Sequence, residues 1–221
     1  MSPSPDRVGK GSGRIEEMPD KPPAPPAPST LDARAYEFLN GLPHGRYSDR
    51  YIGLVSDLGE GAGWAFAGLW LAVLDGRRGR RAAIASTAAA ALSTYLAQRL
   101  LKPIFRRNRP WFTREAAQVV GGKTPDHSFP SGHTAASFAA ATALAMAYPT
   151  ARPLLFATAT AVGVSRIHLG HHFPSDVIAG ALLGTGIGFI SGLAIDVRGQ
   201  PGRSRGIALG SLATIRRSHA G

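Results

Sequence analysis

The chain of 221 residues contains no cysteine, and its 25 lysines and arginines against 14 acidic residues give a formal net charge of +11. The lack of cysteine excludes disulfide bonds, thiolate metal sites and cysteine nucleophiles. The positive charge favours a nucleic acid, an anionic membrane surface or a phosphorylated substrate as the partner. Because the arginines form short clusters between long Ala, Leu, Gly and Val stretches, we favour a membrane protein and expect no nucleic-acid binding.

The N-terminal residues are rich in proline, glycine, serine and charge, so we expect residues 1–30 to form a disordered tail. This tail has no apolar run of signal-peptide length. From Leu31 onward, apolar residues recur at helical spacing until Gly41 and Pro43. The pattern predicts a short amphipathic helix of the kind that lies at a membrane interface.

Five apolar segments follow, and several approach the roughly 20 residues that span a bilayer core. The segments lie at about residues 53–74, 82–101, 134–149, 151–169 and 177–195. We therefore expect an all-α, membrane-embedded bundle with about five transmembrane helices, and a soluble alanine-rich bundle is the alternative. The bundle occupies residues 51–197 as a single domain, after the short helix and linker at 31–50 and before a basic C-terminal tail at 198–221.

The last apolar segment has a glycine at every fourth position, which predicts one helical face that contacts a neighbouring helix closely in lipid. These glycines are Gly180, Gly184, Gly188 and Gly192.

A basic cluster from Lys102 to Pro110 follows the second apolar segment. Lys102 can hold a phosphoryl group as a point charge, and Arg109 can hold it through a planar fork. Taken alone, the cluster is more typical of a basic anchor beside a membrane.

The sequence Phe-Pro-Ser-Gly-His-Thr opens the third apolar segment. Pro130 at the start of a helix, with Ser131 and Gly132 beside it, favours an anion site at the positive end of the helix dipole. His133 can donate a proton to a leaving oxygen, because an ordinary imidazole has a pKa of about 6.5. Helix capping is the simpler alternative for a lone histidine at this position.

The third cluster links the fourth and fifth segments and contains Ser165, Arg166, His168, His171, His172 and Asp176. An imidazole can attack phosphorus through one ring nitrogen when a carboxylate holds the other as N–H, and His172 with Asp176 can supply this pair. Three histidines also suggest zinc, but their spacing does not fix three ligands around an open position. We therefore expect no metal and no cofactor.

All three clusters fall on one side of the predicted bundle, as expected of one site.

Together the clusters resemble the signature of the type 2 phosphatidic acid phosphatase (PAP2) superfamily, K-x6-R-P, P-S-G-H and S-R-x5-H-x3-D. The matching residues are Lys102, Arg109 and Pro110, then Pro130, Ser131, Gly132 and His133, then Ser165, Arg166, His172 and Asp176. The order of the helices extends the resemblance to about residues 50–195.

The resemblance implies a phosphohistidine formed on His172, with Asp176 orienting the ring and His133 protonating the departing oxygen. It also implies that the phosphoryl oxygens are bound by Lys102, Arg109, Ser131, Gly132 and Arg166, with no metal required. His168 and His171 lie outside the signature.

We expect an integral membrane hydrolase of a lipid phosphate or diphosphate, such as a polyprenyl diphosphate, phosphatidic acid or phosphatidylglycerol phosphate. The alternatives are a lipid phosphotransferase of the same superfamily, a soluble enzyme that shares the signature, and a non-catalytic protein that binds anionic lipid. The sequence leaves the oligomeric state open.

The arginine-rich segment 77–81 and the C-terminal arginines lie opposite the site, so the positive-inside rule places the site on the outer face of the membrane. Seven basic residues before the first segment favour the reverse, although their distance from a span weakens their effect.

Overall fold

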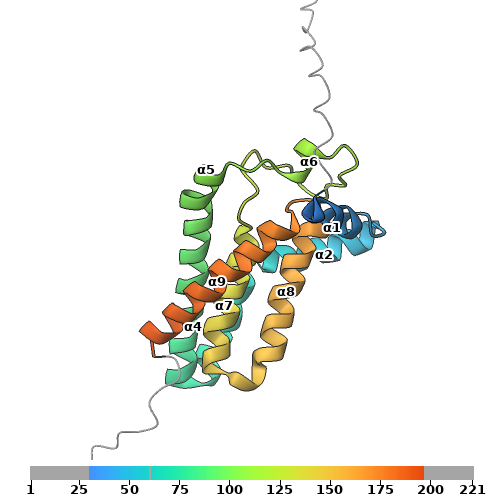
Figure 1. Cartoon of the computed structure of the whole chain (residues 1–221). Helices are drawn as coiled ribbons and strands as arrows, with labels where there is room; N and C mark the ends of the chain where they lie inside the picture. The colour runs from blue at the N-terminus through green and yellow to red at the C-terminus, as the bar shows by residue number, and fades with distance from the viewer. Residues whose placement is uncertain (1–29, 60, 197–221) are drawn as a thin grey trace, which may run out of the picture.

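The structure is a computed structural model, and it describes residues 30–59 and 61–196. The described residues form helices and connecting segments, with no strand among them (Figure 1). This confirms the expected all-α fold. The predicted proline-rich tail, apart from Thr30, and the whole predicted basic tail at 198–221 lie outside the described residues.

The first helix, α1 (Leu31–Asn40), has the predicted bounds. It begins where the Thr30 hydroxyl accepts a hydrogen bond from the backbone N–H of Ala33 at 3.2 Å, and it ends at Gly41. Such an N-terminal cap satisfies one of the N–H groups that have no partner within a helix.

The prediction of a single helix over residues 53–74 is wrong. The structure has two helices in this region, α2 (Arg46–Leu58) and α3 (Ala62–Leu74). Gly61 lies between them with a φ of +139°, a conformation that side chains disfavour. Gly59 ends α2 so close to α8 (Arg152–His168) that an added Cβ would lie 2.4 Å from the Val162 side chain. The two glycines therefore allow a sharp change of direction that the apolar pattern alone did not reveal.

The second expected segment lies within one long, continuous helical run. It consists of α4 (Gly76–Tyr95), a π-helical segment η1 (Leu96–Leu101) and α5 (Lys102–Phe105). A π-helical turn widens the helix locally and often occurs at functional sites. Here it directly precedes Lys102. A short helix, α6 (Pro110–Thr113), follows the basic cluster.

The last three expected segments correspond to α7 (Gly132–Ala147), α8 (Arg152–His168) and α9 (Pro174–Ala194), with one 3-10 turn, η2 (Pro149–Ala151), before α8. Helix α7 is buried along nearly its whole length, and it contacts α4, α8 and α9 (Figure 1). Its many alanines allow these helices to pack closely around it.

The glycine stripe of α9 lies against α7, as the spacing predicted. An added Cβ would come within 2.5 Å of the Ser131 carbonyl oxygen at Gly180, within 2.2 Å of Ala135 O at Gly184 and within 2.3 Å of Ala139 O at Gly188. These positions thus admit no side chain without separating the two helices.

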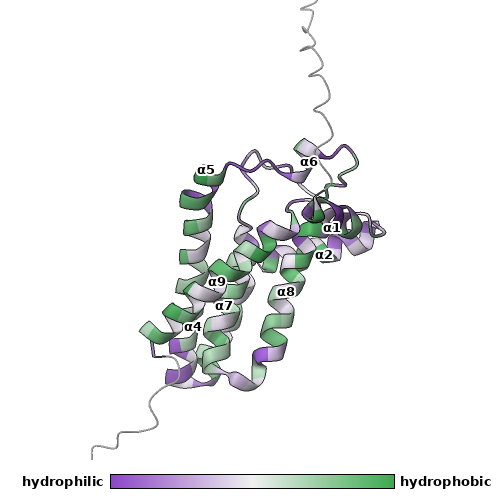
Figure 2. Ribbon diagram, viewed as in Figure 1, coloured by the Kyte–Doolittle hydropathy of each residue, from purple (hydrophilic) through white to green (hydrophobic). Residues whose placement is uncertain are grey.

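Large apolar side chains cover the outer surfaces of several helices, among them Phe66, Leu69 and Trp70 on α3 and Leu182 and Ile190 on α9. In Figure 2, apolar residues recur along the helices, whereas the connecting segments around α6 are hydrophilic. Within the described chain, α9 alone is both long and apolar enough to cross a membrane by itself, and α3 is apolar but shorter. The expected number of about five transmembrane helices is therefore only partly supported.

The α7–α9 contact predicts a position-dependent effect of adding one methyl group. Gly184→Ala forces a carbon against the Ala135 carbonyl, and overpacking of this kind costs about 1–3 kcal/mol, or roughly 2–12 °C in melting temperature. Gly186→Ala is the matched control, because no atom lies within 4 Å of its added Cβ. Thermal unfolding in detergent measures both variants, and equal melting temperatures would contradict the close contact.

Candidate active site

The three polar clusters meet at the end of the bundle where α7 begins. The backbone N–H of Ser131 donates to the carbonyl oxygen of Asp176 at 3.0 Å, which joins the second cluster to the third. The Arg109 guanidinium donates to the carbonyl oxygen of His171 at 3.0 Å, which joins the first to the third. The fold therefore brings the site residues predicted from the sequence into one region.

The arginine-rich start of α4 lies at the other end of the bundle. Arg78 Nε donates to the carbonyl oxygen of Ala147, the last residue of α7, at 3.1 Å. His133 lies near the first residue of the same helix. The basic segment and the site are thus separated by the length of α7.

The ring of His172 is buried, with 2% of the residue exposed, and its orientation is fixed by a backbone group. Its Nδ1 lies 2.8 Å from the carbonyl oxygen of Ser128. A carbonyl oxygen can only accept a hydrogen bond, so Nδ1 carries the hydrogen. In the neutral ring, Nε2 consequently holds the lone pair.

Burial lowers the pKa of His172 to about 4. The carboxylate of Asp176, with Oδ2 3.7 Å from Nδ1, opposes this shift, and the positive charges of Arg109 and Arg166 add to it. The imidazole is therefore neutral at pH 7, which is the state in which Nε2 is nucleophilic.

Asp176 has no exposed surface and lies in the first turn of α9. Its Oδ1 accepts from Arg107 Nη1 at 2.6 Å, and its Oδ2 accepts from the backbone N–H of Phe173 at 2.8 Å. The hydrogen bond that the sequence assigned to Asp176 is thus made by the Ser128 carbonyl, and Asp176 acts on His172 from a longer distance.

Arg107 is a residue that the sequence did not single out. Besides Asp176, it binds Ser175 Oγ at 2.6 Å and Asp32 Oδ2 at 2.5 Å, and its guanidinium lies 4.3 Å from the centre of the Phe173 ring. Burial raises the pKa of Asp32, but the hydrogen bonds from Arg107 and Ser175 outweigh it and lower that pKa overall. Arg107 therefore ties α1 to the start of α9.

Asp126 is the second residue that the sequence missed. Its carboxylate forms an ion pair with Lys102 Nζ and accepts from Arg109 Nη2 at 2.6 Å. Burial alone would raise the pKa of Asp126, but the hydrogen bond from Lys102 and the nearby charges hold it well below its usual range. A carboxylate thus binds both cations of the first signature part, as a phosphoryl group would.

A cavity of about 520 Å³ is lined in part by His133, Arg166 and His171. Arg166 is buried, and its Nη1 donates to Ser56 Oγ of α2 at 2.8 Å. The cavity therefore contains the predicted general acid and one predicted phosphate-binding arginine.

Ser131 and Gly132 lie at the start of α7. The Ser131 hydroxyl accepts from Thr134 Oγ1 at 2.9 Å. A Cβ at Gly132 would lie 3.2 Å from Nε2 of Gln98, which belongs to the π-helical segment. The Gln98 side chain thus packs against Gly132 in the first turn of α7, where backbone N–H groups favour an anion.

The fold and the site define an all-helical protein with a buried, neutral histidine beside a cluster of cations suited to a phosphoryl group. The chain belongs to the PAP2 superfamily, whose family model matches residues 82–198.

Relatives and solved structures support this assignment. The chain is 37% identical to decaprenylphosphoryl-5-phosphoribose phosphatase of Mycobacterium tuberculosis, over 58% of this chain and 69% of the relative. It is 35% identical to undecaprenyl-diphosphatase of Sulfolobus acidocaldarius, over 41% of this chain and 44% of the relative. The crystal structure of Aquifex aeolicus LpxE aligns with a TM-score of 0.60 and 28% identity, and covers 73% of this chain and 94% of that chain. The family and these relatives support a membrane-bound lipid phosphatase.

The position of Asp126 predicts that its carboxylate competes with phosphate. Asp126→Asn is expected to lower the inhibition constant of inorganic phosphate about tenfold, because the amide no longer neutralises Lys102 and Arg109. Asp57→Asn is the control, since it removes a negative charge from the cavity that His133 and Arg166 line, whereas the carboxylate that binds both cations is that of Asp126. An equal change in both variants, or a weaker inhibition by phosphate in Asp126→Asn, would contradict direct competition.

Proposed function

We propose that this protein hydrolyses the terminal phosphate of a lipid phosphate or diphosphate through a phosphohistidine on His172. The observation that carries the proposal is the hydrogen bond from His172 Nδ1 to the Ser128 carbonyl, which leaves Nε2 as the nucleophilic nitrogen. The adjacent cations supply the positive charge that a phosphoryl transition state requires.

In the first step, His172 Nε2 forms a bond to phosphorus while the bond from phosphorus to the lipid oxygen breaks. His133 gives its proton to the departing oxygen. In the second step, water attacks the phosphohistidine, His133 takes a proton from that water, and inorganic phosphate leaves with the histidine restored.

The phosphoryl oxygens bind Lys102, Arg109 and Arg166, together with the backbone of Ser131 and Gly132 at the start of α7. Asp126 leaves the two cations when the phosphoryl group arrives. Because side-chain cations and a helix terminus stabilise the developing charge, we propose that phosphoryl transfer proceeds without a metal.

The lipid part of the substrate has a suitable surface beside the site. An open, mostly apolar groove of about 650 Å³ runs between α2 and α8, and its lining includes Leu42, Ile52, Val55 and Val164. Ser165, a signature residue, also lines it. The groove suits an apolar lipid chain, and the named activities of the two relatives favour a polyprenyl-linked phosphate or diphosphate over a glycerolipid.

We further propose that the site faces the outer side of the membrane, because the exposed arginines at the start of α4 lie at the opposite end of the bundle.

Transfer of the phosphoryl group to an acceptor other than water is the second candidate function within the same chemistry. It would give a labelled product other than inorganic phosphate.

His172→Ala is expected to reduce phosphate release by at least about 10³-fold, because it removes the nucleophile. His171→Ala is the matched control and should retain activity within about tenfold. Phosphate release in detergent is measured with decaprenylphosphoryl-5-phosphoribose, undecaprenyl diphosphate, phosphatidic acid and phosphatidylglycerol phosphate. Wild-type turnover by His172→Ala would refute the nucleophile, and preference for a glycerolipid would refute the polyprenyl assignment.

The lowered pKa of His172 predicts how the free protein titrates. Its imidazole is expected to remain neutral as the pH falls from 7 to 5 and to gain a proton only near pH 4. Nitrogen-15 NMR of labelled histidine follows this titration directly, and His172→Ala identifies the signal. Protonation of that ring near pH 6.5 would show that burial does not control it.

A further inference from the structure

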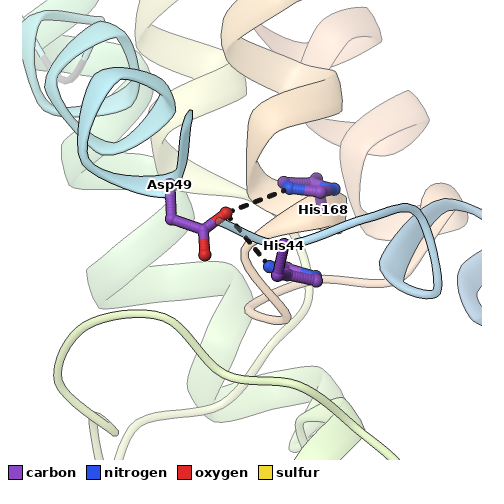
Figure 3. A group of neighbouring side chains, drawn as sticks. All are labelled: His44, Asp49 and His168. Carbon is purple, nitrogen blue, oxygen red and sulfur yellow. Dashed lines mark hydrogen bonds and ion pairs between the residues drawn. The ribbon is translucent and has the colours of Figure 1, made fainter. Parts of the chain in front are cut away.

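Outside the PAP2 signature, two imidazoles and one carboxylate converge on a common point (Figure 3). His44 lies between α1 and α2, Asp49 lies in the first turn of α2, and His168 is the last residue of α8. The phosphatase mechanism uses none of these three residues.

The ligand atoms of the three side chains are close together. Oδ1 of Asp49 lies 3.1 Å from Nδ1 of His44 and 3.5 Å from Nε2 of His168, and all three ligand atoms lie within 4.8 Å of one another. The two rings are stacked, with centroids 4.2 Å apart and planes inclined by 9°. Figure 3 shows both rings presenting a nitrogen to the same carboxylate oxygen.

The opposite nitrogen of each ring faces a backbone carbonyl. His44 Nε2 lies 3.0 Å from the carbonyl oxygen of Asn40, and His168 Nδ1 lies 3.2 Å from that of Leu39. Since a carbonyl oxygen only accepts, each of these nitrogens carries a hydrogen. In the neutral rings, the lone pairs then lie on the two nitrogens that face Asp49.

Without a positive charge between them, these lone pairs and the carboxylate oxygen form a group of three acceptors with no donor. His168 Nε2 is buried and makes no hydrogen bond. Protonating both rings would stack two cations face to face against one carboxylate, whereas a single cation at the centre satisfies all three atoms. The C-terminus of α1, which supplies both carbonyls, adds a negative helix dipole that also favours a cation.

We propose that His44, Asp49 and His168 bind one first-row divalent cation with zinc-like ligand preferences. Ligand atoms about 2.0–2.1 Å from a tetrahedral zinc lie about 3.3 Å from one another, close to the two separations that involve Asp49. The carbonyls of Leu39 and Asn40 fix the ring tautomers, as outer partners of metal-bound histidines commonly do.

The ion joins the α1–α2 segment to the end of α8, just before the segment that holds His172. Asp49 also lines the cavity that contains His133 and Arg166. The role of the ion is to hold these helices in place, and it takes no part in the bonds made and broken at phosphorus.

Metal content tests the proposal without any substrate. The full chain in detergent is stripped with EDTA, exposed to zinc, freed of unbound zinc and analysed by mass spectrometry. Wild type is expected to retain about one zinc per chain, and His44→Gln and His168→Gln should bind it at least tenfold more weakly. His127→Gln is the matched control, because it removes an imidazole outside the cluster.

A wild-type protein that retains no zinc would overturn the proposal, and so would retention that neither His44→Gln nor His168→Gln reduces. If these variants do not fold, the wild-type protein still decides the question. Zinc should raise its melting temperature and that of His127→Gln, and EDTA should reverse both increases. If zinc does not shift the melting temperature of the wild-type protein, the proposed metal site is overturned.

Discussion

The buried carboxylate of Asp176 is the constraint around which the site is arranged. A charge with no exposed surface requires nearby compensation, and removing one partner of such a pair typically costs about 3–5 kcal/mol. Arg107 and the Phe173 N–H provide that compensation and fix the start of α9. Arg107 also binds Asp32, so the same charge holds α1 over the site. One buried acid therefore connects elements from both ends of the described chain, and His172 is held between them.

The second constraint is the close contact between α7 and α9. Glycines on α9 and alanines on α7 let the two backbones approach, and the Ser131 N–H reaches the Asp176 carbonyl at the same end. The packing of small residues thus sets the distance between the P-S-G-H turn and the histidine segment. In a membrane, where apolar side chains gain little by leaving lipid, such shape complementarity is a main source of helix association. The stability of the bundle and the geometry of the site consequently depend on the same contact.

Most of the helices and the signature residues could be predicted from the sequence, because apolar segments and motif spacing are local patterns. The break between α2 and α3 could not, since it depends on Gly59 meeting Val162 of a distant helix. The partner of His172 Nδ1 was missed because a backbone carbonyl has no residue type to recognise. Asp126 lies just before the P-S-G-H motif and Arg107 lies within the first one, but only the fold shows what each binds. His44 and His168 are far apart in the sequence, so spacing gave no sign of their contact.

Charge explains how the site can be stable before the substrate binds and still favour phosphate. Lys102 and Arg109 are almost fully buried, and two unpaired cations there would repel each other and lose hydration. The single negative charge of Asp126 offsets this cost and keeps both side chains in place. In the proposed mechanism a terminal phosphate replaces Asp126, because its charge of about −1.5 to −2 and its three acceptor oxygens attract the same cations more strongly than one carboxylate does. A phosphodiester, with one charge, has no such advantage, so the proposed exchange favours a terminal phosphate over an internal one.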